Sequence, residues 1–160
     1  DDLNSCGVGF FVLSHLQKTY LDGAAFICNK NPFVVYTCRY DRIDNFWFVV
    51  AHEIAHILNH YDFLNEPFLD NLDEKAESER EKQADSCAGR YLNQDKVIEV
   101  GQQYGKYLNA SRLNLISEQS QVSVPVALGM LQHFGLLDWR QFAKYKEHVK
   151  KLIPNEFIRG

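Results

Sequence analysis

The chain has 160 residues and a formal net charge of −4 at pH 7, and 46% of its residues are hydrophobic. This is ample apolar material for one core, so we predict a single domain over residues 1–160. The acidic balance offers no basic surface to nucleic acid, and no apolar run approaches the roughly 18 residues of a membrane span, so neither DNA binding by this segment nor a membrane partner is expected.

Three short β-strands are predicted in the first part of the chain. Residues 7–14 (GVGFFVLS) and 33–39 (FVVYTCR) are rich in β-branched and aromatic residues, and residues 24–28 form a shorter run of the same kind. Asp22-Gly23 precedes the middle strand and Asn29–Pro32 follows it, and both are typical turn sequences. Because brief turns join the strands, we expect a small, mainly antiparallel three-stranded sheet.

The next element is a predicted helix over residues 46–60, which Asp41 or Asp44 can cap. Apolar residues recur along one side of this helix, which favours packing into a core. They are Trp47, Val50, Ile54, Ile57 and Leu58.

After this helix, the acidic residues 62–73 are predicted to form a loop. The remaining helices are expected over residues 74–92, from a cap at Asp95 to about 107, over 110–120, from Ser123 with Pro125 in its first turn, and from a cap at Asp138 to about 152. Strands followed by mostly helical sequence predict an α+β fold.

The predicted helix over residues 46–60 contains His52, Glu53 and His56 in the HExxH spacing. Residues four apart lie on the same face of a helix, so both histidines can bind one ion. Glu53 flanks that face and can reach a water molecule beside the ion. Two ligands, an open coordination position and a carboxylate base are what metal-assisted hydrolysis requires.

A metal held by two histidines needs a third protein ligand, and three residues are candidates. His60 lies eight residues beyond His52, too far along the helix to share the ion, and is interpreted as a neighbour of the ligands or a surface residue. Asp62 lies ten residues beyond His52, as the last ligand of HExxHxxGxxH metzincins does, but Met130 is in a predicted helix rather than a Met-turn. Glu81 is favoured, with Asp85 four residues later on the same helical face.

HEIAHILNH followed by EKQADSCAGRYL resembles the ImmA/IrrE-like metallopeptidases, which combine an HExxH helix with an E-x-x-A-[ND] helix. LDGAAF and NPFVVYTCRYDRIDNFWF resemble the strands that precede the motif in that family. SVPVALGMLQHFGLL resembles the C-terminal segment of the version fused to a helix-turn-helix in HigA-type antitoxins and phage-like regulators. The resemblance implies a zincin-like helical bundle behind the sheet, and it implies that this chain is the C-terminal part of a longer regulator.

The resemblance assigns roles to individual residues. His52, His56 and Glu81 match the ligands of one Zn²⁺ per chain, Glu53 matches the general base, and Asp85 matches the acid that orients a ligand. In the family's reaction the base takes a proton from the attacking water and a further donor stabilises the oxyanion. Four residues are candidates for that donor or for substrate contacts: His60, Tyr61, Tyr91 and His133.

The implied substrate is one partner protein, a helix-turn-helix repressor or a cognate toxin, in a repressor, toxin–antitoxin or stress-response system. Residues 33–39 are predicted to be an edge strand that aligns an extended substrate. Two alternatives remain open: a catalytically silent, zinc-stabilised module that binds a partner, and a metzincin-like peptidase that uses Asp62.

Four scattered cysteines form no CxxC pair and no disulfide framework, which favours free thiols in a cytoplasmic protein. They are Cys6, Cys28, Cys38 and Cys87. The last of these stands where the resembled family usually has a bulky apolar residue.

Overall fold

The computed structural model describes residues 2–14, 20–64, 74–154 and 158–159. The strands are β1 (Gly9–Leu13), β2 (Gly23–Cys28), β3 (Asn31–Tyr36) and β4 (Ile158–Arg159). The α-helices are α1 (Asp2–Ser5), α2 (Ile43–Asn59), α3 (Tyr61–Leu64), α4 (Glu74–Tyr91), α5 (Gln94–Tyr104), α6 (Ala110–Ser120) and α7 (Val124–His133). Short 3₁₀ turns are η1 (Gly105–Tyr107), η2 (Ala143–Tyr145) and η3 (Val149–Lys151).

The α+β class is confirmed, but the sheet is mixed rather than mainly antiparallel. Its strand order is β2-β3-β1-β4, with β2 antiparallel to β3 and with β1 parallel to both β3 and β4. Asn29 and Lys30 both adopt positive φ angles, 50° and 67°, as a tight hairpin turn requires. That turn specifies the β2–β3 hairpin alone, and no local signal specifies the strand beside which β1 lies.

The strand order also shows that the predicted edge strand is wrong. Residues 33–39 overlap β3, which lies between β2 and β1, and Val34 and Tyr36 have no exposed surface. Among the described strands, β2 forms the edge of the sheet that lies beside α2 and α3. An unbroken apolar run such as Phe33–Tyr36 is typical of a central strand that is covered on both faces.

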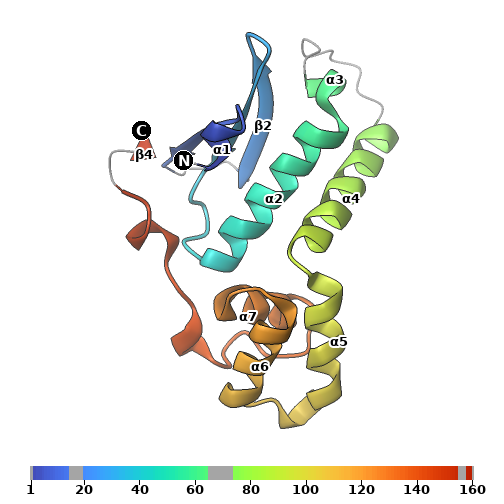
Figure 1. The fold of residues 1–160 in the computed structure, drawn as a ribbon, viewed down its shortest axis with the longest axis vertical. Helices are drawn as coiled ribbons and strands as arrows, with labels where there is room; N and C mark the ends of the chain where they lie inside the picture. The colour runs from blue at the N-terminus through green and yellow to red at the C-terminus, as the bar shows by residue number, and fades with distance from the viewer. Residues whose placement is uncertain (1, 15–19, 65–73, 155–157, 160) are drawn as a thin grey trace.

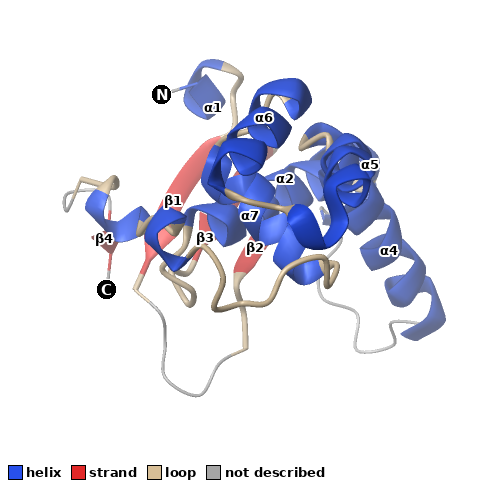
Figure 2. Cartoon of the chain, turned by 90° about the horizontal axis from the view of Figure 1, so that it is seen from below, coloured by secondary structure: helices blue, strands red, loops and turns tan. Residues whose placement is uncertain are grey.

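Helix α2 is the central element of the fold. It contacts β2 and β3 on one side, α4 on another and α7 near its N-terminal end. In Figure 1 it crosses the molecule between the sheet and α4, with α5, α6 and α7 gathered below it. The end-on view of Figure 2 places α2 and α7 between the strands and the pair formed by α4 and α5. Among the described residues, no helix combines the length and the apolarity needed to cross a bilayer.

The predicted apolar stripe of this helix is only partly buried. Val50 and Ile57 lie inside, while Trp47 and Leu58 are 47% and 65% exposed. The main core lies instead where α2 meets the sheet and α5–α7. Its fully buried members include Val12, Tyr36, Val97, Val100, Leu113, Ile116, Leu128 and Leu131.

The predicted helix caps were wrong in two places. Arg42 occupies the N-cap position of α2, and its guanidinium pairs with the carboxylate of Asp44. Asp41 accepts a hydrogen bond from the Lys150 N–H at 2.8 Å, so it serves the C-terminal segment. Helix α5 begins after Asn93, which places Asp95 in its first turn.

The predicted start of α7 is confirmed, whereas the predicted start of the loop before α4 is wrong. Helix α7 begins after Ser123 as predicted, although the Ser123 hydroxyl makes no capping hydrogen bond. The predicted loop over 62–73 begins instead inside α3, and residues 65–73 lie outside the described part of the chain.

The predicted helix over residues 138–152 is wrong. The segment contains only the turns η2 and η3. The Gln132 side-chain amide donates to the carbonyl oxygens of Asp138 and Gln141, at 3.1 and 3.0 Å, and Phe142 has a φ of +56°. These tertiary bonds and the left-handed residue hold the backbone out of a helix despite its sequence propensity.

Candidate metal centre

Three side chains from two helices converge on one point. His52 and His56 lie on successive turns of α2, and Glu81 reaches them from α4. The two Nε2 atoms are 3.0 Å apart, and each lies 3.2 Å from an oxygen of the Glu81 carboxylate. Among the described residues, this is the group of histidine, cysteine and acidic side chains whose donor atoms are close enough to share an ion.

The spacing of the donor atoms fits a tetrahedral metal ion. Bonds of about 2.0–2.1 Å at tetrahedral angles place neighbouring ligand atoms about 3.3 Å apart, close to the observed 3.0–3.2 Å. Burial lowers the pKa of His56, against the opposing influence of Glu81. The imidazole is thereby kept neutral, which is the form that binds metal.

The hydrogen bonds around both histidines leave the metal-facing nitrogens free to act as ligands. His52 donates from Nδ1 to Asp85 over 2.9 Å. His60 donates from Nε2 to the side-chain oxygen of Gln83 over 3.0 Å, so its Nδ1 accepts from His56 Nδ1 over 3.1 Å. Each ligand histidine is therefore protonated at Nδ1 and offers the lone pair of Nε2 to an ion.

This arrangement places His60 beside a ligand, one of the two positions expected for it from the sequence. The contact between Gln83 and His60 was not predicted from the sequence. It lies two residues after Glu81, a spacing that does not share a helical face, and only the crossing of α2 and α4 brings it to His60.

Small buried residues allow α2 and α4 to approach. Ala55 and Ala84 are fully buried and form a small cluster with Cys87, which is 4% exposed. The Cys87 sulfur accepts contacts from Arg90 at 3.1 Å and from Asn59 at 3.7 Å. The departure noted from the sequence at residue 87 therefore affects the packing of the two helices and leaves the ligands in place.

Glu53 lies on the sheet side of α2 and is 8% exposed. Burial raises its pKa to about 7, and Glu81 adds to this effect, while His52 and a hydrogen bond from the Ala25 backbone N–H act to lower it. A carboxyl group with such a pKa can both take up and release a proton near neutrality.

Gly23 and Ala25 were not identified from the sequence. A Cβ atom at Gly23 would lie 2.4 Å from Val49 and 3.0 Å from Glu53, so glycine permits the close approach of β2 to α2. The sequence DG was interpreted as a turn signal, and only the packing of the two elements shows this second requirement.

The other predicted site residues are dispersed. Tyr61 donates its hydroxyl to the Lys30 carbonyl at 3.1 Å, and Asp62 lies beside it on α3, outside the ligand cluster. Tyr91 is 48% exposed at the end of α4. His133 is the one predicted oxyanion or substrate residue among these that lines the cavity beside the metal centre.

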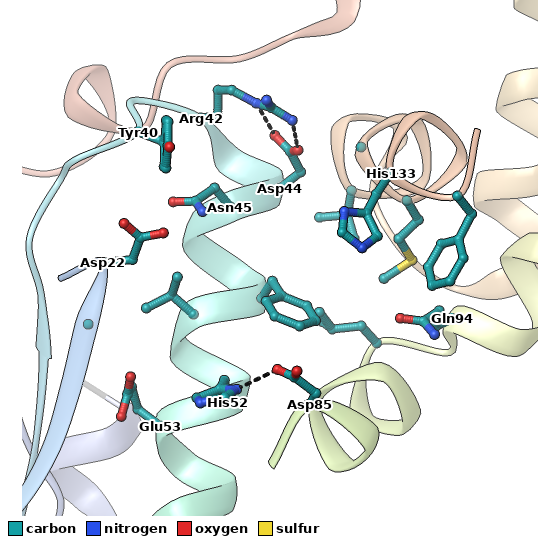
Figure 3. Close-up of a pocket in the computed structure, with 18 of the residues that line it drawn as sticks. Asp22, Tyr40, Arg42, Asp44, Asn45, His52, Glu53, Asp85, Gln94 and His133 are labelled. Atoms are coloured by element: carbon teal, nitrogen blue, oxygen red, sulfur yellow. Dashed lines mark hydrogen bonds and ion pairs between the residues drawn. The ribbon is translucent and has the colours of Figure 1, made fainter. Parts of the chain in front are cut away.

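That cavity has a volume of about 710 Å³, within the range of small-molecule and peptide side-chain sites. It runs along α2 from His52 and Glu53, between the start of β2 and helix α7. Figure 3 shows Asp85 beside His52, and His133 directed into the same cavity from α7.

The comparison with known families agrees with this geometry. The profile described as the IrrE N-terminal-like domain, of peptidase family M78, matches residues 12–128. No curated protein sequence matches the chain. The match confirms the ImmA/IrrE resemblance and gives no support to the narrower comparison with HigA-type antitoxins.

Proposed function

Because the chain belongs to peptidase family M78 by its IrrE N-terminal-like domain, we propose that it is a zinc-dependent metallopeptidase. The observation that carries the proposal is the convergence of two unprotonated histidine nitrogens and one carboxylate beside the buried Glu53. Nitrogen and oxygen ligands in a tetrahedral arrangement, with one position left open, suit catalytic zinc. Zinc held there would polarise a substrate carbonyl and acidify a water molecule.

The residues of the chain have separable tasks in this reaction. Glu53 accepts the proton of the attacking water and delivers it to the leaving amine, as its pKa of about 7 permits. Asp85 holds the His52 ring, and His60 with Gln83 holds the His56 ring, so neither imidazole rotates during turnover. His133 is the candidate donor to the oxyanion because it lines the cavity.

The outer edge of β2 among the described strands is positioned to align an extended substrate. The Ala25 N–H points away from β3 and hydrogen-bonds Glu53, so this edge faces the reacting groups. A peptide added beside β2 would bring its backbone past Glu53. This replaces the sequence-based assignment of that role to residues 33–39.

We propose a single partner protein as substrate, a helix-turn-helix repressor or a cognate toxin. The outer edge of β2 supports this, because a sheet edge would bind the backbone of an extended segment, and such segments are exposed at few places in a folded protein.

The test compares the wild-type protein with Glu53→Gln, using a repressor or toxin encoded beside the gene as substrate and mass spectrometry as readout. Glu53 binds no metal in this scheme, so the variant keeps zinc and partner affinity and loses cleavage. Asp62→Asn, an exposed change outside the ligand cluster, is the control and cleaves normally. If the wild type and Glu53→Gln bind the partner equally and neither cleaves it, the chain is a zinc-stabilised binding module.

A further inference from the structure

The cavity beside the metal centre has a second side, which lies between α2 and α7. Phe48 and His52 both line it, share one face of α2 because they are four residues apart, and have ring centroids 6.3 Å apart. Met130 and His133, three residues apart on α7, line it as well. Figure 3 shows His133 on this side of α2, whereas Glu53 lies on the side of the sheet. This part of the cavity therefore begins within reach of a substrate bond held at the metal centre.

The walls of this side of the cavity are apolar. Phe134 remains 48% exposed, and Phe48 is not one of the partly buried apolar side chains that pack on the main core in the described part of the chain. Apolar side chains that line a cavity without filling a core are typical of ligand sites. We refer to the part of the cavity lined by Phe48, Leu92, Met130 and Phe134 as the Phe48 pocket.

The Phe48 pocket is closed at the end away from the metal centre. Asp44 lies one turn before Phe48 on α2, and a Cβ atom at Gly129 of α7 would clash with the Asp44 side chain. The two helices are therefore in close contact at that end. Four residues of helix, roughly 6 Å, separate Phe48 from His52 at the other end. A pocket of this depth suits one side chain of a substrate.

The charges of the cavity do not call for a charged ligand. Apart from Glu53, the acidic residues of its lining each pair with a basic or histidine side chain: Asp22 with Arg39, Asp44 with Arg42, and Asp85 with His52. Moving an unpaired charge into apolar surroundings is costly. An apolar side chain carries no such cost and gains from the removal of its surface from water.

From these observations we infer that the Phe48 pocket binds a large apolar side chain, such as leucine or phenylalanine, next to the scissile bond of the substrate. Phe48 and Phe134 supply the apolar surface that contacts this side chain, while the neighbouring His52 belongs to the metal centre. This inference rests on the proposed peptidase function. It makes Phe48 and Phe134 specificity-determining residues.

The test uses peptide hydroxamates whose residue next to the zinc-binding group carries the side chain of leucine, phenylalanine, alanine, lysine or glutamate. The hydroxamate binds the metal and so presents this side chain beside the metal centre. Dissociation constants are measured by calorimetry with the zinc-loaded wild type and with zinc-loaded Phe48→Ala and Phe134→Lys, and the zinc content of each protein is measured separately.

Each variant has a matched control. Trp47→Ala removes an aromatic side chain beside Phe48 on α2, at a position that is 47% exposed and outside the described lining of the cavity. Leu115→Lys introduces the same charge as Phe134→Lys at an exposed apolar residue of α6, also outside that lining.

The wild type is expected to bind the leucine or phenylalanine compound at least about tenfold more tightly than the alanine compound, because added methylene groups in an apolar pocket are worth this much. The lysine and glutamate compounds bind no more tightly than the alanine compound. Phe48→Ala lowers the ratio of leucine to alanine affinity at least about threefold. Phe134→Lys makes the glutamate compound bind more tightly than the lysine compound, and both controls behave as the wild type does.

Similar affinities for all the compounds, or a wild-type preference that survives in both Phe48→Ala and Phe134→Lys, would overturn the pocket while leaving the metal centre intact. If no compound binds the zinc-loaded protein, the metal centre fails and the pocket fails with it. An apolar preference in a protein that cleaves no partner would support the pocket and count against the peptidase.

Discussion

Asp85 occupies the position from which a single carboxylate can fix the orientation of a ligand. It accepts from His52 Nδ1 at 2.9 Å although its own side chain is 60% exposed. Solvent weakens the attraction between exposed charges, so Asp85 acts through the direction of its hydrogen bond more than through the strength of an ion pair. The bond fixes both the tautomer and the rotation of the imidazole.

The different contacts of Glu81, Asp85 and Asp62 therefore predict a ranking of zinc affinities. Glu81→Ala removes a ligand and should abolish tight binding, whereas Asp85→Asn should weaken it by roughly 10–100-fold, as outer partners of ligands usually do. Asp62→Ala should leave the affinity unchanged because Asp62 lies outside the cluster. Competition with a fluorescent zinc chelator gives all three values. A larger loss for Asp62→Ala than for Glu81→Ala would restore the metzincin-like assignment.

Among the site residues, the sequence predicted those whose relative positions depend only on spacing within one helix. His52 and His56 face one ion because they lie one helical turn apart in any α-helix. The requirement for glycine at position 23 depends on how closely β2 approaches α2, and no local pattern encodes that approach.

Two helices carry the ligands, and the distance between them is set by small side chains. Ala55 and Ala84 are fully buried at their contact. Any larger residue there moves α4, and with it Glu81, away from the histidines.

The close contact between α2 and α4 thus predicts that Ala84→Leu weakens metal binding although it changes no ligand residue. Overpacking typically costs about 1–3 kcal/mol of stability, and the displaced carboxylate should lower zinc affinity as well. The exposed neighbour change Ser86→Leu adds the same side chain to α4 and is the control. Urea unfolding and zinc titration measure the two effects. Equal behaviour of both variants would show that the helix spacing is not what positions Glu81.

The C-terminal segment is attached to the start of α2 through Asp41. Burial acts to raise the pKa of this carboxyl, but the Lys150 N–H and His148 outweigh it and lower the pKa below its ordinary 3.8. An acid whose folded pKa is lowered contributes stability above its unfolded pKa, and this contribution is lost as the pH falls through the folded value.

Asp41→Asn should therefore destabilise the metal-free protein at pH 7, and the difference from wild type should shrink as the pH falls below about 3.8. Chemical unfolding at a series of pH values gives the free-energy difference directly. Asp62→Asn, at an exposed site, should show no comparable pH-dependent difference. A deficit for Asp41→Asn that stays constant down to pH 3 would mean that the negative charge of Asp41 is unimportant.

The elements themselves were predictable to differing degrees. The positions of α2, α4 and α6 follow from apolar periodicity and composition over more than ten residues each. Residues 138–152 have helical propensity as well, but the Gln132 side-chain amide donates hydrogen bonds to two of their backbone carbonyl oxygens. Those bonds form only in the folded chain. The order of the strands could not be predicted from the sequence for the same reason, because β3, the partner of β1, is distant in sequence.

Binding of a metal ion would be coupled to folding of the whole chain, since the candidate ligands join α2 to α4 and α2 also contacts the sheet and α7. A ligand present at 100 times its dissociation constant stabilises the folded state by about 2.7 kcal/mol. For a chain of this size that corresponds to a rise in melting temperature of roughly 5–10 °C.

Removing zinc with a chelator should lower the melting temperature by a shift of this order, and adding zinc back should reverse it. Differential scanning calorimetry on the wild type and Glu53→Gln makes the comparison, and both should respond alike because Glu53 is not a ligand. A melting temperature that is independent of zinc in both proteins would show that the cluster holds no metal in solution.

The unequal burial of the three candidate ligands has a consequence for how quickly a bound metal ion would exchange. His52 lies inside α2, and His56, although in the last turn, is only 8% exposed, so both are held by a helix that is packed on several sides. Glu81 is 52% exposed and belongs to a helix with fewer neighbours. A bound ion would therefore leave from the Glu81 side while both imidazoles still held it. The rate of its exchange with solution would then report the local opening of α4 rather than the unfolding of the core.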